Sequence, residues 1–73
     1  MLKINEIIAH NVEKILEQKK MKQNELADAM KISRSTMREI MDGGKVITPV
    51  LQNKIAEALS VKVKDLLSMD SYN

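Results

Sequence analysis

Hydrophobic residues recur at three- and four-residue steps along most of the chain, with charged residues between them. This spacing places them on one face of an amphipathic helix. A first stripe predicts a helix that runs to about Lys19, and a second predicts a short helix from about Gln23 to Met30. The two stripes consist of Ile4, Ile7, Ile8, Val12, Ile15 and Leu16, and of Leu26, Ala27 and Met30.

A third helix is expected after a break in the pattern. Ser33 is a strong N-cap residue, and apolar residues repeat at helical spacing from Met37 to Met41. We therefore expect a helix over about 34–42. The pair Gly43-Gly44 ends it, because glycine takes the left-handed conformation without strain.

Two more helices complete the pattern. Thr48-Pro49 pairs a capping hydroxyl with proline at the first helical position, which predicts a helix to about Leu59. Apolar residues between Val63 and Leu67 predict a last short helix. Five short helices with short connections are typical of a compact all-helical domain. We therefore expect one domain over residues 1–67 and a polar C-terminal tail over residues 68–73.

The composition favours helices and narrows the possible chemistry. Of the 73 residues, 44% are hydrophobic and 30% are charged, and Tyr72 is the single aromatic residue. Such a chain is long enough for one small globular domain, and its abundant residue types prefer helices to strands. With no cysteine and one histidine, His10, neither a disulfide framework nor a metal site is expected. We also expect no cofactor, no small-molecule ligand and no enzymatic activity.

Charge and hydropathy bear on location and partners. The N-terminus carries charge throughout, and no apolar stretch approaches the roughly 20 residues of a membrane span, so a cytoplasmic protein with no membrane partner is expected. The net charge of +2 is too small to indicate a nucleic-acid partner by itself. However, seven bases and four acids lie between Lys19 and Lys45, a local charge of +3, and both arginines fall there.

Two short helices separated by a three-residue turn, with a basic second helix, have the geometry of a helix-turn-helix, which lays one helix in the DNA major groove. On spacing alone, an ordinary helical bundle remains open. The residues, however, resemble the helix-turn-helix of phage repressor and Cro proteins, the xenobiotic-response-element type of bacterial regulator. The resemblance is carried by Gln23-Asn24-Glu25-Leu26-Ala27, Met30-Lys31-Ile32-Ser33-Arg34-Ser35-Thr36-Met37, Ile40 and Gly43, with Asn11-Val12 and Ile15 upstream and Ile55-Ala56, Ala58-Leu59, Val61 and Leu66-Leu67 downstream.

The resemblance implies a five-helix lambda-repressor-like domain whose third helix is the recognition helix. It implies contacts to DNA bases from Ser33, Arg34, Ser35, Arg38 and Glu39. Arginine is the commonest reader of guanine, because it forms paired hydrogen bonds to O6 and N7. Arg34 is the strongest candidate for such a contact, whereas Arg38 could instead grip a phosphate or pair with Asp42 one turn on.

The resemblance also implies contacts to the DNA backbone. Gln23 matches the phosphate-contacting glutamine of the family, although an exposed helix start would also carry a polar residue. Lys45 resembles part of the loop that grips the backbone, although a solvated lysine is the plainer interpretation. The candidate backbone contacts are Gln23, Asn24, Gly44, Lys45 and Thr48.

Several positions depart from the family pattern. Lys31 replaces a turn glycine, so a residue with a side chain must take a positive φ at a cost of about 1 kcal/mol. Residues at helix ends, namely Lys22, Ser60 and Lys62, replace a cap or a glycine. Leu16 and Met41 stand where the family commonly has an arginine and a glutamate in an ion pair. Exchange of both partners can be neutral or stabilising, so we expect these two side chains to touch.

Some apolar residues lie outside the positions that the family uses for its core. They either fold back onto the core or form a homodimer seam. These residues are Leu2, Ile4, Ile7, Val46 and Ile47. In a homodimer seam they would be joined by Val61, Val63, Leu66 and Met69.

The sequence predicts a DNA-binding transcriptional regulator, and specifically a repressor that binds a two-fold operator as a homodimer. Double-stranded DNA and a second copy of the chain are the expected partners. The alternative is a protein-binding module, an antitoxin or phage-encoded inhibitor that uses the same fold to occlude a partner protein. The mild net charge and the acids Glu39 and Asp42 on the third helix keep this alternative open.

Overall fold

The computed structural model describes residues 4–68, which form five α-helices and, within this range, no β-strand. The helices are α1 (Ile4–Lys19), α2 (Gln23–Met30), α3 (Arg34–Met41), α4 (Pro49–Leu59) and α5 (Val63–Leu66). The expected all-helical fold is confirmed. Two predicted helix ends are wrong by one residue, because Asp42 is the C-cap of α3 and Leu67 is the C-cap of α5.

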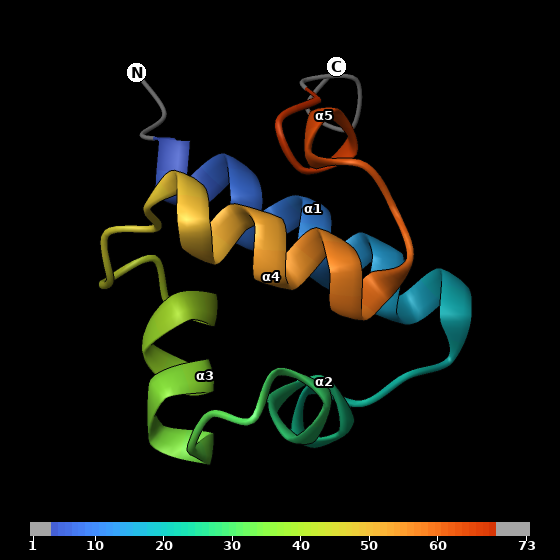
Figure 1. Ribbon diagram of the computed structural model, residues 1–73, viewed down its shortest axis with the longest axis vertical. Helices are drawn as coiled ribbons and strands as arrows, with labels where there is room; N and C mark the ends of the chain where they lie inside the picture. Colours follow the sequence, from blue (N-terminus) through green and yellow to red (C-terminus); the bar gives the residue numbers. More distant parts are fainter. Residues whose placement is uncertain (1–3, 69–73) are drawn as a thin grey trace.

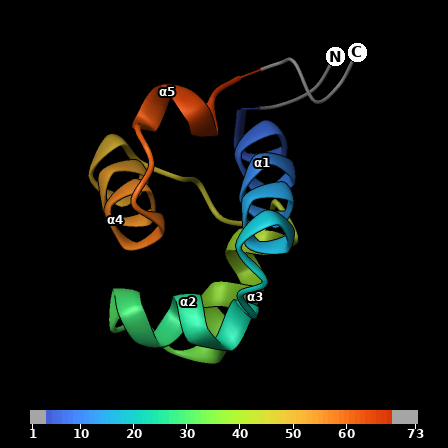
Figure 2. The same cartoon turned by 90° about the vertical axis from the view of Figure 1, so that its right-hand side faces the viewer.

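The helices pack in a closed ring around one core. α1 contacts α3 and α5, α2 contacts α3 and α4, and α4 contacts α5. Figure 1 shows α4 in front of α1 in the upper part of the molecule, with α2 and α3 below them. In Figure 2, α5 bridges α1 and α4 at the top, while α2 and α3 close the bottom. In the predicted helix-turn-helix pair, α3 therefore packs against α1, and α2 packs against α4.

Aliphatic side chains and two methionines, Met30 and Met37, fill the centre of this ring. The largest fully buried side chains are Ile8, Val12, Leu26, Met37, Ile40, Ile55, Leu59 and Leu66. Burial of each such side chain contributes about 1.5–3 kcal/mol relative to leaving it exposed. Because the chain has no cysteine, this core must hold the domain together without a disulfide.

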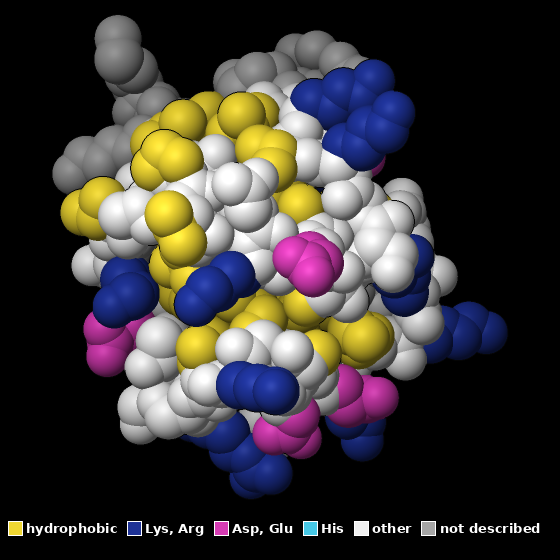
Figure 3. All heavy atoms as spheres, viewed as in Figure 1, with side chains coloured by type: hydrophobic (Ala, Val, Ile, Leu, Met, Phe, Trp, Pro, Cys, Tyr) yellow, Lys and Arg dark blue, Asp and Glu magenta, His cyan; other side chains and the backbone are white. Residues whose placement is uncertain are grey.

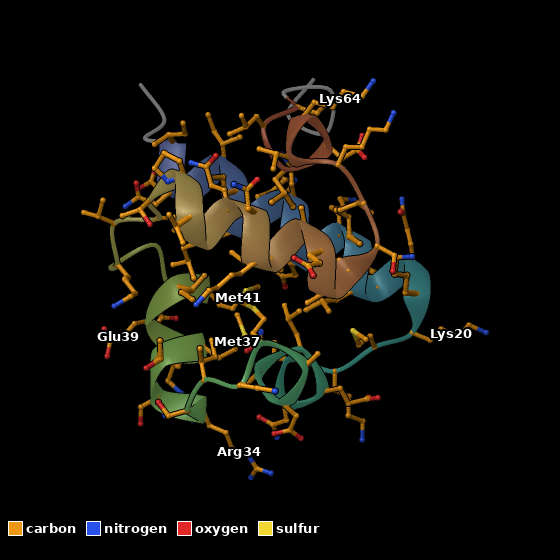
Figure 4. All side chains as sticks on the ribbon, viewed as in Figure 1. Lys20, Arg34, Met37, Glu39, Met41 and Lys64 are labelled. Atoms are coloured by element: carbon orange, nitrogen blue, oxygen red, sulfur yellow. The ribbon has the colours of Figure 1, made fainter. Side chains whose placement is uncertain are left out.

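Met41 was expected to meet Leu16 across the contact of α1 and α3. Leu16 is buried, and Met41 is half-buried against the core. Met41 lines a shallow hollow together with Ala9 and Glu13 of α1, and it points into the molecule in Figure 4. The side chain therefore faces α1, and its direct contact with Leu16 stays a prediction.

Four helices end with a residue in the left-handed conformation. The φ values are 54° at Lys20, 58° at Lys31, 75° at Gly43 and 58° at Ser60. After α2, the Lys31 amide donates to the Asp28 carbonyl and the Ile32 amide to the Ala27 carbonyl, both at 3.1 Å. These two bonds are the Schellman motif, which satisfies carbonyls that have no partner within the helix. The positive φ predicted at Lys31 is confirmed.

α2 and α5 each have a lysine at the N-cap. In each helix, an acidic side chain of the first turn accepts a hydrogen bond from the backbone amide of that lysine. At α2, the Glu25 carboxylate accepts the Lys22 amide at 3.1 Å. At α5, the Asp65 carboxylate accepts the Lys62 amide at 3.0 Å. A negative charge in the first turn also interacts favourably with the helix dipole. These acids offset part of what the missing capping side chains would contribute.

A buried asparagine fastens the end of α5 to α1. Asn11 is 4% exposed, and its Nδ2 donates to the carbonyls of Leu66 at 2.7 Å and Ser68 at 2.8 Å. Carbonyls at a helix end have no partner within the helix, so this side chain supplies one. The first residue of the predicted polar tail is thus held by the domain, while residues 69–73 of the tail lie outside the described range.

The spare hydrophobic residues divide into two groups. Ile47 and Leu66 are 4% and 0% exposed, so a homodimer seam made from them is wrong, because they belong to the core. Ile4 and Val46 are 52% and 75% exposed, and so is Val50 of α4, at 66%. The remaining described members, Ile7, Val61 and Val63, are half-buried, and Leu2 and Met69 lie outside the described residues.

Candidate nucleic-acid interface

α3 has an inward face and an outward face. Met37 is 1% exposed and points into the molecule, whereas Arg34 and Glu39 point away from it in Figure 4. Ser35 and Arg38 are also exposed. Because residues four apart lie one turn apart on the same face, Arg34 and Arg38 form one row, and Ser35 and Glu39 form a second row beside it. The structure thus brings four of the predicted base contacts onto one surface.

The fifth predicted base contact, Ser33, is the N-cap of α3. Its hydroxyl oxygen accepts the Thr36 amide at 3.1 Å, and the hydroxyl donates to Thr36 Oγ1 at 2.8 Å. A contact from Ser33 to a base would therefore compete with the cap. Thr36 was not selected from the sequence, although its position three residues after a capping serine is the signal that identifies this partner.

The start of α2 carries two predicted backbone contacts. Gln23 and Asn24 are exposed, and the N-terminus of a helix attracts anions. The carboxylate of Glu25 lies in the same turn, where it accepts the Lys22 amide. Its negative charge weakens the attraction of this helix start for phosphate. The polar side chains of Gln23 and Asn24 are then the groups that this turn offers to a DNA backbone.

The loop between α3 and α4 carries the other three predicted backbone contacts. The Gly44 amide donates to the Glu39 carbonyl at 3.1 Å, so this N–H is used within the chain. The Thr48 hydroxyl accepts the Leu51 amide at 3.2 Å and caps α4. Lys45 is half-buried. Of these three residues, Lys45 therefore brings the positive charge that a phosphate contact needs.

Two side chains from distant elements hold this loop in place. Asn5 of α1 donates its Nδ2 to the Gly43 carbonyl at 3.1 Å. Gln52 of α4 donates its Nε2 to the Ile47 carbonyl at 3.2 Å. Neither residue was selected from the sequence. The partner of Asn5 lies 38 positions along the chain, and that of Gln52 lies five positions back in an irregular loop whose course has no sequence pattern. The loop that carries Lys45 is thus fastened near both of its ends.

The charges around the outward face of α3 are balanced rather than uniformly positive. Arg34 and Arg38 share the exposed surface of the helix and its C-cap with the acids Glu39 and Asp42. Figure 3 shows basic and acidic side chains interspersed over the face that it draws. Such a surface attracts DNA weakly at long range, so recognition must rest on the pattern of short-range contacts.

Comparison with known proteins identifies this arrangement. Residues 11–71 match the family of Cro/C1-type helix-turn-helix DNA-binding domains. The chain belongs to this family. The crystal structure of the clp gene regulator ClgR from C. glutamicum is similar to this fold, with a TM-score of 0.85 and 24% identity over 92% of this chain and 87% of that chain. No curated protein matches the sequence.

The Cro/C1-type assignment confirms the resemblance seen in the sequence and makes α2 and α3 the helix-turn-helix pair. DNA binding is the activity after which the family is described. Within residues 4–68, no group of three or more histidine, aspartate and glutamate side chains could hold a metal ion. In that same range, none of the helices is both long enough and apolar enough to cross a membrane.

Proposed function

We propose that the protein is a sequence-specific transcriptional repressor that binds a two-fold operator as a homodimer, with α3 in the major groove. The observation that carries this proposal is the division of α3. Met37 and Ile40 are 1% and 0% exposed, while Arg34, Ser35, Arg38 and Glu39 are all exposed. Because the apolar face of α3 packs against the core, its polar face remains exposed and available to contact base edges. In this proposal Arg34, in the first turn, pairs with a guanine.

Phosphate contacts set the position of α3 without reading sequence. In this proposal they come from Gln23 and Asn24 at the start of α2 and from Lys45 in the loop after α3. The first two offer amide groups, and Lys45 offers a charge. These residues come before and after α3 in the chain, so they can grip the backbone on both sides of the groove.

The homodimer follows from the shortness of α3. An eight-residue helix with four exposed polar side chains in two rows reaches only a few base pairs. Each correct base pair contributes about 1–3 kcal/mol of discrimination, so a single half-site gives little specificity. Two copies related by a two-fold axis double the number of bases read. Their α3 helices would lie one DNA turn apart, about 34 Å.

Selection of binding sites from random duplexes tests this proposal. We expect enrichment of an inverted repeat whose half-sites are about one helical turn apart. Binding of the enriched duplex should weaken steeply as salt is raised, because phosphate contacts release counterions. The proposal of DNA recognition fails if no sequence is enriched. It fails in its dimeric part if a single half-site is enriched and no second half-site accompanies it.

One feature favours the alternative, a module that binds another protein. Glu39 on the outward face of α3, Asp42 at its end and Glu25 at the start of α2 are exposed acids that a DNA phosphate would repel. A basic partner protein would instead be attracted by them. The same salt titrations separate the two functions, since this alternative requires no affinity for duplex DNA at low salt.

A further inference from the structure

Lys45 differs from the other basic residues that the structure describes. Among the lysines and arginines of residues 4–68, it alone is half-buried, and the others are exposed. A lysine can cover its methylene stem with protein while its charged end stays in water. Such a side chain has fewer conformations to lose when it binds a phosphate than a fully exposed lysine has. The position of the charge then depends on the backbone that carries Lys45.

This backbone follows two residues that have no side chain. Gly43 and Gly44 come directly before Lys45, and Gly43 has a φ of 75°. Glycine has the widest choice of backbone conformations, so a pair of glycines needs restraint from elsewhere. Their amides donate to the Ile40 and Glu39 carbonyls of α3, both at 3.1 Å. These bonds occupy the two amides and leave the Gly43 carbonyl to another partner.

Asn5, in the first turn of α1, is that partner. Its Nδ2 donates to the Gly43 carbonyl at 3.1 Å, from 38 positions away along the chain. The carbonyl lies two residues before Lys45. α1 also packs against α3. The bond therefore ties the peptide that leads to Lys45 to the helix that supports α3.

The other side of Lys45 is held by the core. Ile47, two residues after Lys45, is 4% exposed. Gln52 of α4 also donates its Nε2 to the Ile47 carbonyl at 3.2 Å, but the buried side chain would keep Ile47 in place without this bond. The two residues before Lys45 are glycines and have no side chain to bury. On that side the bond from Asn5 restrains the chain.

We propose that Asn5 is a positioning residue for DNA binding, which acts through Lys45. This inference rests on the proposed function, in which Lys45 contacts a phosphate. By holding the Gly43 carbonyl against α1, Asn5 keeps Lys45 at a fixed place relative to α3. The phosphate contact and the base contacts then fit the same stretch of DNA. Groups that bind a ligand depend on supporting hydrogen bonds of this kind for their geometry.

The charge of the two residues allows this role to be separated from a direct contact. The salt slope of DNA binding counts the phosphates that lysines and arginines neutralise. Asn5 is neutral, so its removal releases or retains no counterion by itself. A change in the salt slope after Asn5→Ala must therefore come from a charged residue that Asn5 holds in place.

A double-mutant cycle tests the proposal. Asn5→Ala, Lys45→Ala and the double variant are titrated at several salt concentrations with the duplex enriched by selection and with its scrambled version. Asn5→Ala should weaken binding of both duplexes at least three-fold and lower the salt slope, as Lys45→Ala does. Added to Lys45→Ala, it should cause less than a further 1.5-fold loss, because residues that act through one another are not additive. An undiminished loss in the Lys45→Ala background, or an unchanged salt slope in Asn5→Ala, would overturn the proposal.

Asn11→Ala is the matched control for a loss of stability. Asn11 also donates to carbonyls near a helix end, those of Leu66 and Ser68. These lie at α5, at the opposite corner of the molecule from α3 (Figure 1). Under conditions where denaturant unfolding shows each variant to be folded, Asn11→Ala should change the affinity by less than two-fold and leave the salt slope unchanged. If it lowered both as Asn5→Ala does, the effect would be one of general stability and the proposal would be wrong.

Amide hydrogen exchange tests the restraint without DNA. Amides exchange when the structure around them opens locally. The Gly44 amide should exchange at least ten-fold faster in Asn5→Ala than in the unmodified protein, while the Ile55 amide in α4 keeps its rate. No acceleration at Gly44 would overturn the proposal, because the loop would then keep its place without Asn5.

Failure of this inference can be distinguished from failure of the proposed function. If no duplex is enriched, DNA recognition is wrong and the role of Asn5 is wrong with it. If a duplex is enriched and Lys45→Ala lowers the salt slope while Asn5→Ala does not, the phosphate contact stands and the positioning role of Asn5 is wrong.

Discussion

The two connections on either side of α3 are built from similar parts but are held in different ways. The turn before α3 begins with Lys31 in the left-handed conformation and ends with Ser33 as a hydroxyl cap. The loop after α3 begins near the left-handed Gly43 and ends with Thr48 as a hydroxyl cap. Each connection therefore stops one helix with a left-handed residue and starts the next with a capping hydroxyl.

The difference lies in how the residues between the two caps are fixed. In the short turn, the single residue Ile32 separates Lys31 from Ser33, so the local bonds leave little freedom. In the longer loop, Asn5 reaches the Gly43 carbonyl across 38 positions of sequence, and Ile47 is buried in the core. A short turn can be specified by its own residues, whereas this loop takes its shape from side chains elsewhere in the fold.

The largest expected effect tests the role of Ile47. Ile47→Ala should destabilise the protein by about 3 kcal/mol, because it removes a buried side chain and leaves a cavity. Ile32→Ala, in the half-buried position of the short turn, should cost about 1 kcal/mol. Denaturant unfolding measures both. Equal costs would show that the two connections depend on the core to the same extent.

The second prediction concerns the glycine that opens the loop. Gly43→Val should destabilise the protein by about 2–3 kcal/mol, because a β-branched residue is strained at a φ of 75°. A Cβ there would also lie 3.4 Å from Glu6 Cγ. Gly44→Ala is the matched control. Its Cβ would meet nothing nearer than the Glu39 carbonyl oxygen at 3.9 Å, so its stability should change by less than about 0.5 kcal/mol.

The third prediction compares the contributions of the two connections to DNA binding. Arg34→Ala, directly after the short turn, should cost about 1–3 kcal/mol on the selected duplex and relax one base position. Lys45→Ala, in the longer loop, should weaken selected and scrambled duplexes alike and lower the salt slope by about one per subunit. Titrations of both duplexes at several salt concentrations measure these effects. If Arg34→Ala weakened both duplexes equally, Arg34 would be a phosphate contact instead.

The smallest expected effect is a stabilisation. Lys31→Gly should raise the free energy of unfolding by about 1 kcal/mol, because glycine takes the left-handed conformation without strain. Ser60→Gly, with the same φ of 58° at the end of α4, should stabilise by a similar amount. Thermal or denaturant unfolding of both variants provides the measurement. If neither variant gains stability, strain at these positions does not limit the fold.

The residues that could be placed from the sequence share one property, namely that their partners are local. The N-cap serine before α3 and Thr48-Pro49 before α4 located those helices, and the positive φ at Lys31 followed from the family pattern. The partners of Asn11 and Asn5, which lie 38 or more positions along the chain, could not be predicted in this way. Each of these side chains bonds a backbone carbonyl whose position depends on how the helices pack.

Val46 and Ile47 show the difference between what the sequence determines and what the tertiary structure decides. Both are β-branched aliphatic residues, adjacent in one loop, and the sequence treats them as equivalent. Hydrophobic periodicity and capping residues determined the five helices, because both act within a few residues. The packing of α1 and α4 against the loop decided that Ile47 is 4% exposed and Val46 is 75% exposed. Which side of a loop faces the core is set by its distant neighbours, and so the exposure of Val46 became visible only in the folded chain.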